Sequence, residues 1–163
     1  MKVTLTSDQE KVVVRFRAMP EEVQAKLFNT IDDLAKQLAA YIKENKLRGQ
    51  VLNRRSGWLG DNVVAQDPVQ SGNMISAKVT VDGNIVPYAR IHEYGGVIPA
   101  HRIAPKEKLA LAFSWNGQNV VFKSVNIPAI TMPERSYMRS GLSDMRQQII
   151  DRITSVVVST INE

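Results

Sequence analysis

A single long apolar stripe constrains the fold of this chain more than any other feature. Pro20 suits the first position of a helix, and Glu21 and Glu22 suit the positive end of its dipole. Apolar residues then recur at spacings of three and four: Val23, Leu27, Ile31, Leu34, Leu38, and Tyr41 or Ile42. This spacing predicts an amphipathic helix that ends between Asn45 and Gly49. Roughly 26 residues at 1.5 Å each form a rod of about 40 Å, whose stripe needs a sheet or a neighbouring chain to cover it.

A second helix is predicted at the C-terminus. Pro133 begins it, and its apolar residues follow at helical spacing: Met138, Leu142, Met145, Ile149, Ile153, Val156 or Val157, and Ile161. Residues 126–132 are expected to be extended, because Pro128 and Pro133 restrict the backbone.

Alternating apolar and polar residues predict antiparallel strands. Three hairpins are expected, over residues 2–17, 75–91 and 109–125. The last two turn at Asp82-Gly83 and Asn116-Gly117, dipeptides that favour two-residue hairpin turns. Phe113, Trp115 and Phe122 fall near the third hairpin, where a packed core or sheet face is the ordinary explanation and nucleic-acid stacking the alternative.

Two stretches rich in turn-forming residues, 48–73 and 92–108, are predicted as long loops, the first with a short strand over 63–66. Long loops inside a compact domain are often functional or mobile. Helices and strands do not alternate along the chain, which favours an α+β fold on a mainly antiparallel sheet over a doubly wound parallel one. The 163 residues suit a single domain, 1–163.

Composition excludes several classes of protein. Hydrophobic residues make up 44% and charged residues 23%, as in ordinary globular proteins rather than disordered ones. The absence of cysteine rules out a disulfide scaffold, a thiol nucleophile and a Cys-ligated metal. The N-terminal sequence lacks the apolar core of a secretory signal, and no apolar run is long enough to span a bilayer, so no membrane partner is expected.

Catalytic and cofactor motifs are missing from the sequence. It contains no nucleophile elbow and no glycine-rich phosphate loop. His92-Glu93 resembles the start of a zinc-binding HExxH helix, but Gly96 replaces the second histidine. A metal site formed by His92, Glu93 and His101 is an alternative to a plain polar role in a loop. We expect no enzymatic activity and no cofactor.

One basic cluster and one tryptophan stand out in the middle of the chain. The net charge is +5, and the cluster comprises Lys46, Arg48, Arg54 and Arg55. It is either a solvated loop or a contact for a phosphate backbone or an acidic partner. Trp58 either anchors its loop to the core or serves as an interface anchor, since tryptophan is enriched at binding hot spots.

Three segments, in this order, resemble the signatures of a known family. RRSGWL at 54–59 is similar to a T-G-x-L signature that follows a long helix. VPYARIHEYGG at 86–96 is similar to Y-A-x-x-x-E-F/Y-G. VNIPA and MPERSYMRSGL, within 125–142, are similar to I-P-A-R-P-F-L-R-P-A-L. These signatures belong to the tail-completion or head–tail joining proteins of lambdoid-type siphophages and the related Mu-type virion morphogenesis proteins.

The chain departs from these signatures at a few positions. Ser56 replaces the usual threonine, and Ile130-Thr131-Met132 is an insertion within the third segment. Glu134 and Ser136 stand where alanine and proline are usual.

The resemblance implies a non-enzymatic structural or assembly protein of the virion, located in the tail or neck and built in the bacterial cytoplasm. It implies a homo-oligomeric ring around the tail axis, expected to be six-fold, in contact with tail tube, tail terminator or connector components. A mildly basic ring could also make non-specific contact with DNA passing through its lumen, although a charge of +5 per chain does not require this. A tail-terminator or minor tail role, and a nucleic-acid-binding assembly or regulatory factor, are the alternatives.

Candidate interaction residues come from the three segments: Arg54, Arg55, Trp58, Leu59, Tyr88, His92, Glu93, Arg135, Tyr137 and Arg139. Arg135 and Arg139 are four positions apart on the predicted C-terminal helix, so both could reach one acidic partner surface.

Overall fold

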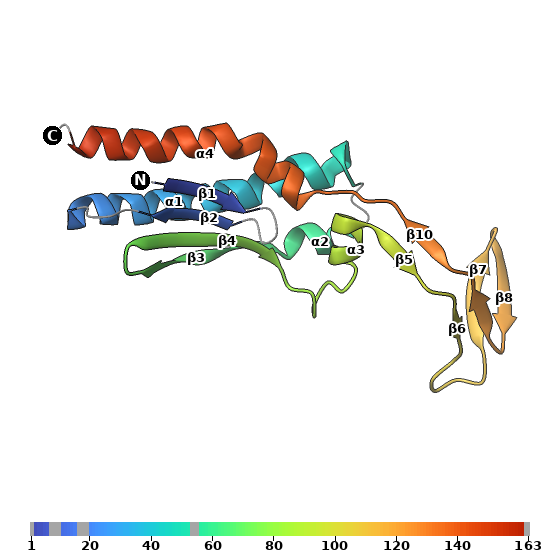
Figure 1. The fold of residues 1–163 in the computed structure, drawn as a ribbon. Helices are drawn as coiled ribbons and strands as arrows, with labels where there is room; N and C mark the ends of the chain where they lie inside the picture. The colour runs from blue at the N-terminus through green and yellow to red at the C-terminus, as the bar shows by residue number, and fades with distance from the viewer. Residues whose placement is uncertain (1, 7–10, 16–19, 53–55, 162–163) are drawn as a thin grey trace.

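The protein consists of a body of two long helices and a four-stranded sheet, from which a narrow arm of short strands projects (Figure 1). The computed structural model describes residues 2–6, 11–15, 20–52 and 56–161. The α+β class is confirmed, although most strands outside the body pair only two by two. None of the described helices is long and apolar enough to cross a bilayer.

The predicted N-terminal helix is confirmed as α1 (Glu21–Tyr41) and its continuation η1 (Ile42–Gln50), a wider π-helix. Every apolar residue of the predicted stripe from Val23 to Leu38 is buried. The helical path ends where Arg48 and Gly49 leave helical geometry, Gly49 with a φ of 109° that favours glycine. The helix therefore ends where its glycine predicts.

The sheet of the body is antiparallel, in the order β1-β2-β4-β3. Its strands are β1 (Lys2–Thr6), β2 (Lys11–Arg15), β3 (Val63–Ser71) and β4 (Met74–Val81). The N-terminal hairpin is confirmed, while its turn and residues 16–17 lie outside the described part. Ile75, Ala77 and Val79 are buried on the face of β4 that meets α1. The core therefore forms between this sheet and α1.

The prediction of a long loop over 48–73 is wrong, but the short strand expected within it over 63–66 is confirmed as the first part of a longer strand. Trp58–Asp61 form a short helix, α2, and β3 is a nine-residue strand that pairs with β4. Gly72, with a φ of 54°, lies in the connection between the two strands. Polar residues and Pro68 hide this strand from a periodicity analysis, because it lies at the edge of the sheet and most of its side chains face solvent.

The predicted hairpin over 75–91 is also wrong. After Asp82-Gly83 the chain closes a local turn, in which the backbone N of Val86 donates to the carbonyl O of Asp82 at 2.8 Å. Pro87 has no N–H for a strand ladder. The chain then forms the short helix α3 (Ala89–Tyr94), so β4 pairs with β3 and β2 instead.

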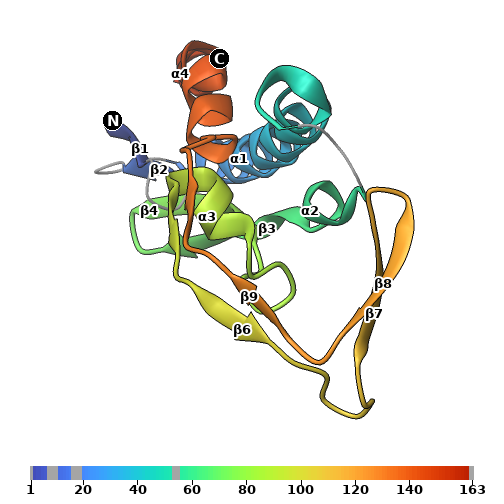
Figure 2. The same cartoon turned by 90° about the vertical axis from the view of Figure 1, so that its right-hand side faces the viewer.

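The stretch 92–108, predicted as a loop, contains the end of α3 and the first strands of the arm. These strands pair with partners far along the chain: β5 (Gly96–Ile98) with β10 (Ile130–Met132), and β6 (His101–Ile103) with β9 (Val125–Ile127). The expected extension of 126–132 is confirmed. The hairpin expected over 109–125 is confirmed as β7 (Leu111–Trp115) and β8 (Gln118–Phe122), which form the end of the arm (Figures 1 and 2).

The C-terminal helix, α4 (Met138–Ile161), starts later than the predicted Pro133. It lies beside α1, and α1 in turn packs on β3 and β4 (Figure 1). Gly141 of α4 allows this helix to approach η1 closely, since a Cβ at position 141 would lie 2.6 Å from Cγ1 of Ile42. Glycine at this position is therefore a packing requirement.

Candidate interaction surface

Parts of the three segments that carry the family resemblance meet at one end of the body, whereas the VNIPA part of the third lies in the arm. The first leads into α2, the second contains α3, and the third enters α4. They build two adjoining features. One is a buried hydrogen-bonded cluster of Glu93 with residues 136–139, called the knot below, and the other is an open cleft between η1, α2 and α3.

Glu93 is the centre of the knot, with only 4% of its surface exposed. Its Oε2 accepts hydrogen bonds from the backbone N of Tyr137 (2.8 Å) and Met138 (2.9 Å). Its Oε1 accepts from Ser136 Oγ at 2.9 Å and from Arg139, through the backbone N at 3.1 Å and Nε at 3.0 Å. A carboxylate at a helix N-terminus satisfies amides that lack partners within the helix and opposes the positive end of its dipole. Glu93 therefore caps α4 from a distant part of the chain.

Arg139 closes the knot from the other side. Its Nη2 donates to the backbone O of Glu93 at 3.0 Å and to Glu134 Oε1 at 2.8 Å, and its guanidinium lies 4.7 Å from the ring centroid of Tyr94. Tyr137 is 1% exposed and its hydroxyl donates to the backbone O of Ala89 at 3.4 Å. Glu93, Tyr137 and Arg139 thus serve the internal structure, although the sequence suggested them as interaction residues.

Gly95 is the glycine that ends the Y-A-x-x-x-E-F/Y-G signature, and its surroundings explain why glycine is found there. Its φ is 68°, and a Cβ there would lie 2.8 Å from the backbone N of Glu134. Only glycine both adopts this conformation readily and lets the third segment pass so closely.

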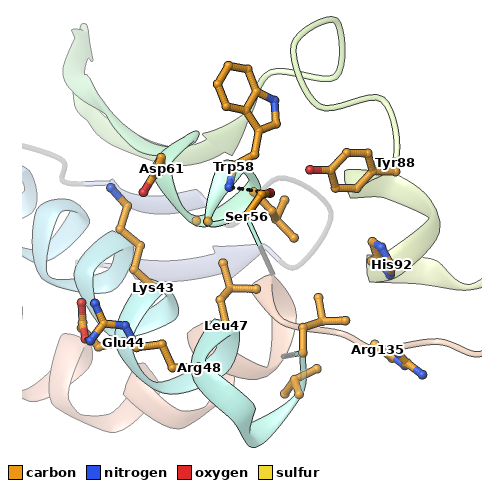
Figure 3. Close-up of a pocket in the computed structure, with 15 residues that line it drawn as sticks. Lys43, Glu44, Leu47, Arg48, Ser56, Trp58, Asp61, Tyr88, His92 and Arg135 are labelled. Atoms are coloured by element: carbon orange, nitrogen blue, oxygen red, sulfur yellow. Dashed lines mark hydrogen bonds and ion pairs between the residues drawn. The ribbon is translucent and has the colours of Figure 1, made fainter. Parts of the chain in front are cut away.

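The cleft brings together the other described candidate residues. Its volume is about 710 Å³, and Trp58, Leu59, Tyr88, His92 and Arg135 all line it (Figure 3). The apolar lining of the cleft was not predicted from the sequence; it consists of Leu47, Val51 and Leu52. These residues lie where η1 unwinds, so helical periodicity no longer identified the side on which they would gather.

Trp58 is half exposed, at 52%, although its Nε1 donates to the backbone O of Ile85 at 3.3 Å. Leu59 is partly buried against the core. Leu59 therefore anchors this segment, and the position of Trp58 favours the interface alternative over the core alternative.

His92 is half-buried, and its Nδ1 is enclosed without a hydrogen-bond partner in the described structure. Its ring meets that of Tyr88 edge-on, with centroids 5.8 Å apart. Burial and the positive charge of Arg135 lower the pKa of His92 below its ordinary value. Both effects favour the neutral form of the imidazole.

The alternative metal site is not assembled. His92 and Glu93 are neighbours in α3, but Glu93 is occupied at α4, and His101 lies in β6 with its Nδ1 3.0 Å from the backbone O of Pro99. Within the described residues, no group of three or more histidine and acidic side chains could hold a metal ion.

The basic cluster does not form one exposed patch in the described residues. Lys46 is buried, with its Nζ 2.6 Å from Asp144 Oδ2. Arg48 Nη1 lies 2.7 Å from Glu44 Oε2. Arg54 and Arg55 lie outside the described residues.

Arg135 and Arg139 do not share a helix face as predicted. Arg135 precedes α4, its backbone N donates to the backbone O of His92 at 2.8 Å, and it lines the cleft. Arg139 belongs to the knot. The reason is the late start of α4, so the four-residue spacing of the two arginines is not a helical spacing.

No family model, curated protein or solved structure matches this chain. The resemblance therefore depends on the three segments themselves. The convergence of parts of all three on one cleft is a property of the fold that no single segment reveals.

Proposed function

We propose that this chain is a non-enzymatic structural or assembly protein of a tailed-phage virion. It acts at the head–tail interface, where a ring of identical copies completes or joins the tail. The observation that carries the proposal is the meeting of parts of all three family-like segments at one end of the body, where the second and third build the Glu93 knot and all three line the cleft.

The structural roles of Glu93, Arg139 and the cleft residues suit an assembly protein better than an enzyme. Glu93 and Arg139 hold α3 to the start of α4, so a rigid corner supports the cleft. The cleft combines an apolar lining with a charged rim and a half-exposed tryptophan, which is the anatomy of a protein-docking surface.

A joining protein must also contact different neighbours through separate surfaces. The cleft lies on the body, whereas the arm ends well away from it (Figure 1). Two separate surfaces on one chain are likewise what a closed ring with head-to-tail contacts requires.

The proposal is tested by immunogold electron microscopy of particles from the phage or prophage that encodes this chain. Label at the junction of head and tail is expected. Label along the tail or at its tip would replace the joining role with that of a minor tail protein, and its absence from complete particles would remove the virion role. Particles grown without the gene, complemented in trans by an epitope-tagged copy, control for antibody specificity.

A DNA-binding assembly factor is the second candidate function, favoured by the charge of the arm. Residues 96–132 contain Arg102, Lys106, Lys108 and Lys123 against Glu107, which gives four minus one, a net charge of +3. Such a role predicts binding to duplex DNA that weakens steeply with salt. Binding no tighter than that of a basic control protein such as lysozyme, measured by fluorescence anisotropy from 50 to 200 mM salt, would exclude it.

A further inference from the structure

The hairpin at the end of the arm has one strongly apolar face. The register pairs Leu111 with Phe122, Phe113 with Val120, and Trp115 with Gln118. Paired residues and alternate residues of a strand share a face, so these six side chains lie on the same side. Alternation of this kind is typical of strands whose apolar face is covered.

Neither long helix of the body covers this face (Figure 1), and only Leu111, Phe113 and Val120 of its six side chains are half-buried. The hairpin lies at the far end of the arm, away from both long helices (Figure 1). Trp115 is 63% exposed and Phe122 47%. The ring contacts of Phe113 are with Trp115, at 6.4 Å between centroids, and with Phe122, at 5.8 Å, all within the hairpin. Because an isolated two-stranded hairpin is at best marginally stable in water, a partner surface is needed to hold this one.

Among the described strands β7 and β8 pair only with each other, which leaves each with one unpaired edge. Residues 111–122 contain no charged residue and no proline, the features that normally protect an exposed edge. The edge strand β3 differs, because it carries Asp67, Pro68 and a register shift between Gln66 and Val69. The edges of the hairpin are therefore suited to pairing, and that of β3 is not.

The charge around the hairpin identifies the kind of partner. Lys108 and Lys123 lie just outside its two strands, with Arg102 and Lys106 nearby. None of these four cations forms an ion pair with any described residue. A second arm would bring the same positive charge, and a DNA backbone would match the flanking cations but leave the apolar face around Trp115 and Phe122 without a partner. An acidic protein surface complements both the basic flanks and the apolar face.

We propose that the β7/β8 hairpin is the docking site for an acidic protein, which adds a β-strand to a free edge of the hairpin. The apolar side chains of that strand pack on the face around Trp115, and its carboxylates meet Lys108 and Lys123. The inference rests on the proposed function only in expecting that the acidic partner is another virion component.

Site-specific photocrosslinking in infected or induced cells tests this docking site. A benzophenone amino acid replaces Trp115, and the matched control replaces Val158, which is 52% exposed on α4. We expect a crosslink from position 115, but not from 158, to a segment of another protein rich in Asp and Glu, identified by mass spectrometry. A crosslink to a second copy of the chain, a crosslink to DNA, or none at all would overturn the proposal.

Charge reversal provides the second half of the test. Lys108→Glu combined with Lys123→Glu should reduce the crosslink at least tenfold. Arg146→Glu combined with Arg152→Glu makes the same change of charge on exposed positions of α4 and should leave it unchanged. Equal crosslinking by both double variants would overturn the acidic partner.

The outcomes separate this proposal from the proposed function. Immunogold label at the head–tail junction without a crosslink from position 115 would keep the joining role and remove the docking site. A crosslink to an acidic protein together with no immunogold label on complete particles would keep the docking site and remove the joining role.

Discussion

A single carboxylate oxygen of Glu93 both caps α4 and pairs with Arg139 in the first turn of that helix. Oε1 lies 3.1 Å from the backbone N of Arg139 and 3.0 Å from its Nε. The two residues are 46 positions apart, so this contact fixes the corner between α3 and α4. The cleft is lined from the same corner by His92 and Arg135, and its shape therefore depends on this pair.

Glu93→Gln should destabilise the protein by at least about 2 kcal/mol, because it leaves Arg139 and the first amides of α4 without a buried charged acceptor. Glu134→Gln is the matched control: it removes a carboxylate that contacts the same guanidinium but has a side chain 55% exposed, and should cost less than about 1 kcal/mol. Urea denaturation of both variants measures the difference. Equal losses would show that Glu93 acts only as a surface partner of Arg139.

Trp58→Ala should cost less than about 1.5 kcal/mol of folding free energy, because the indole is half exposed and loses one hydrogen bond to Ile85. Leu38→Ala, at a fully buried position of α1, should cost about 2–5 kcal/mol in the same urea titration. A loss as large for Trp58 as for Leu38 would make the tryptophan a core residue. A small loss together with failure to assemble would support its role in docking.

Local patterns predicted the elements whose burial is regular. The stripe from Val23 to Leu38 specified α1, and Asn116-Gly117 specified the β7/β8 turn, where φ is 49° and 79°. In both cases the signal lies within a few residues of the structure that it specifies. The α+β class follows from the same elements.

The site could be predicted only in part, because its contacts join distant segments. The Y-A-x-x-x-E-F/Y-G signature suggested Glu93 as a site residue. Its role as a cap follows from where α4 begins, and the prediction from Pro133 placed that start too early. The β5/β10 and β6/β9 ladders join short strands whose partners have no sequence signal. Asp82-Gly83 misled for a related reason: Pro87 and a local hydrogen bond to Asp82 turned the chain away from the sheet.

The free energy of unfolding should fall as the pH is lowered below about 6.5, in part because of His92. Its pKa in the folded protein is lowered by burial and by Arg135. Between that lowered pKa and the ordinary value near 6.5, the unfolded chain binds more protons than the folded one, so acid favours unfolding. Above about pH 8 the imidazole is neutral in both states and contributes almost no slope.

His92→Phe tests this linkage, since phenylalanine preserves a planar ring beside Tyr88 but does not titrate. Urea titrations at pH 5.0, 6.0, 7.0 and 8.0 should show a shallower pH dependence for the variant between pH 5 and 7. Arg135→Gln should bring the pKa of His92, followed by NMR, closer to its ordinary value, though burial will still depress it. An unchanged slope in His92→Phe would assign the acid sensitivity to other groups.

Gly141→Ala should destabilise the contact between α4 and η1. The added methyl would lie 2.6 Å from Cγ1 of Ile42, an atom near the root of its side chain, so the helices must move apart. Overpacking of this kind costs about 1–3 kcal/mol, against a gain of up to about 1 kcal/mol from the helix propensity of alanine. Gly83→Ala, with nothing within 4 Å of the new methyl, should change stability by less than about 0.5 kcal/mol.

A double-mutant cycle isolates the contact between these two residues. Ile42→Ala alone should be costly because Ile42 is fully buried, but it also removes the atom that the new methyl meets. Gly141→Ala should therefore cost less in the Ile42→Ala background than in the native protein, with a coupling of about 1 kcal/mol or more in urea denaturation. Additive losses would mean that glycine is needed at position 141 for a reason other than the close approach of α4 to η1.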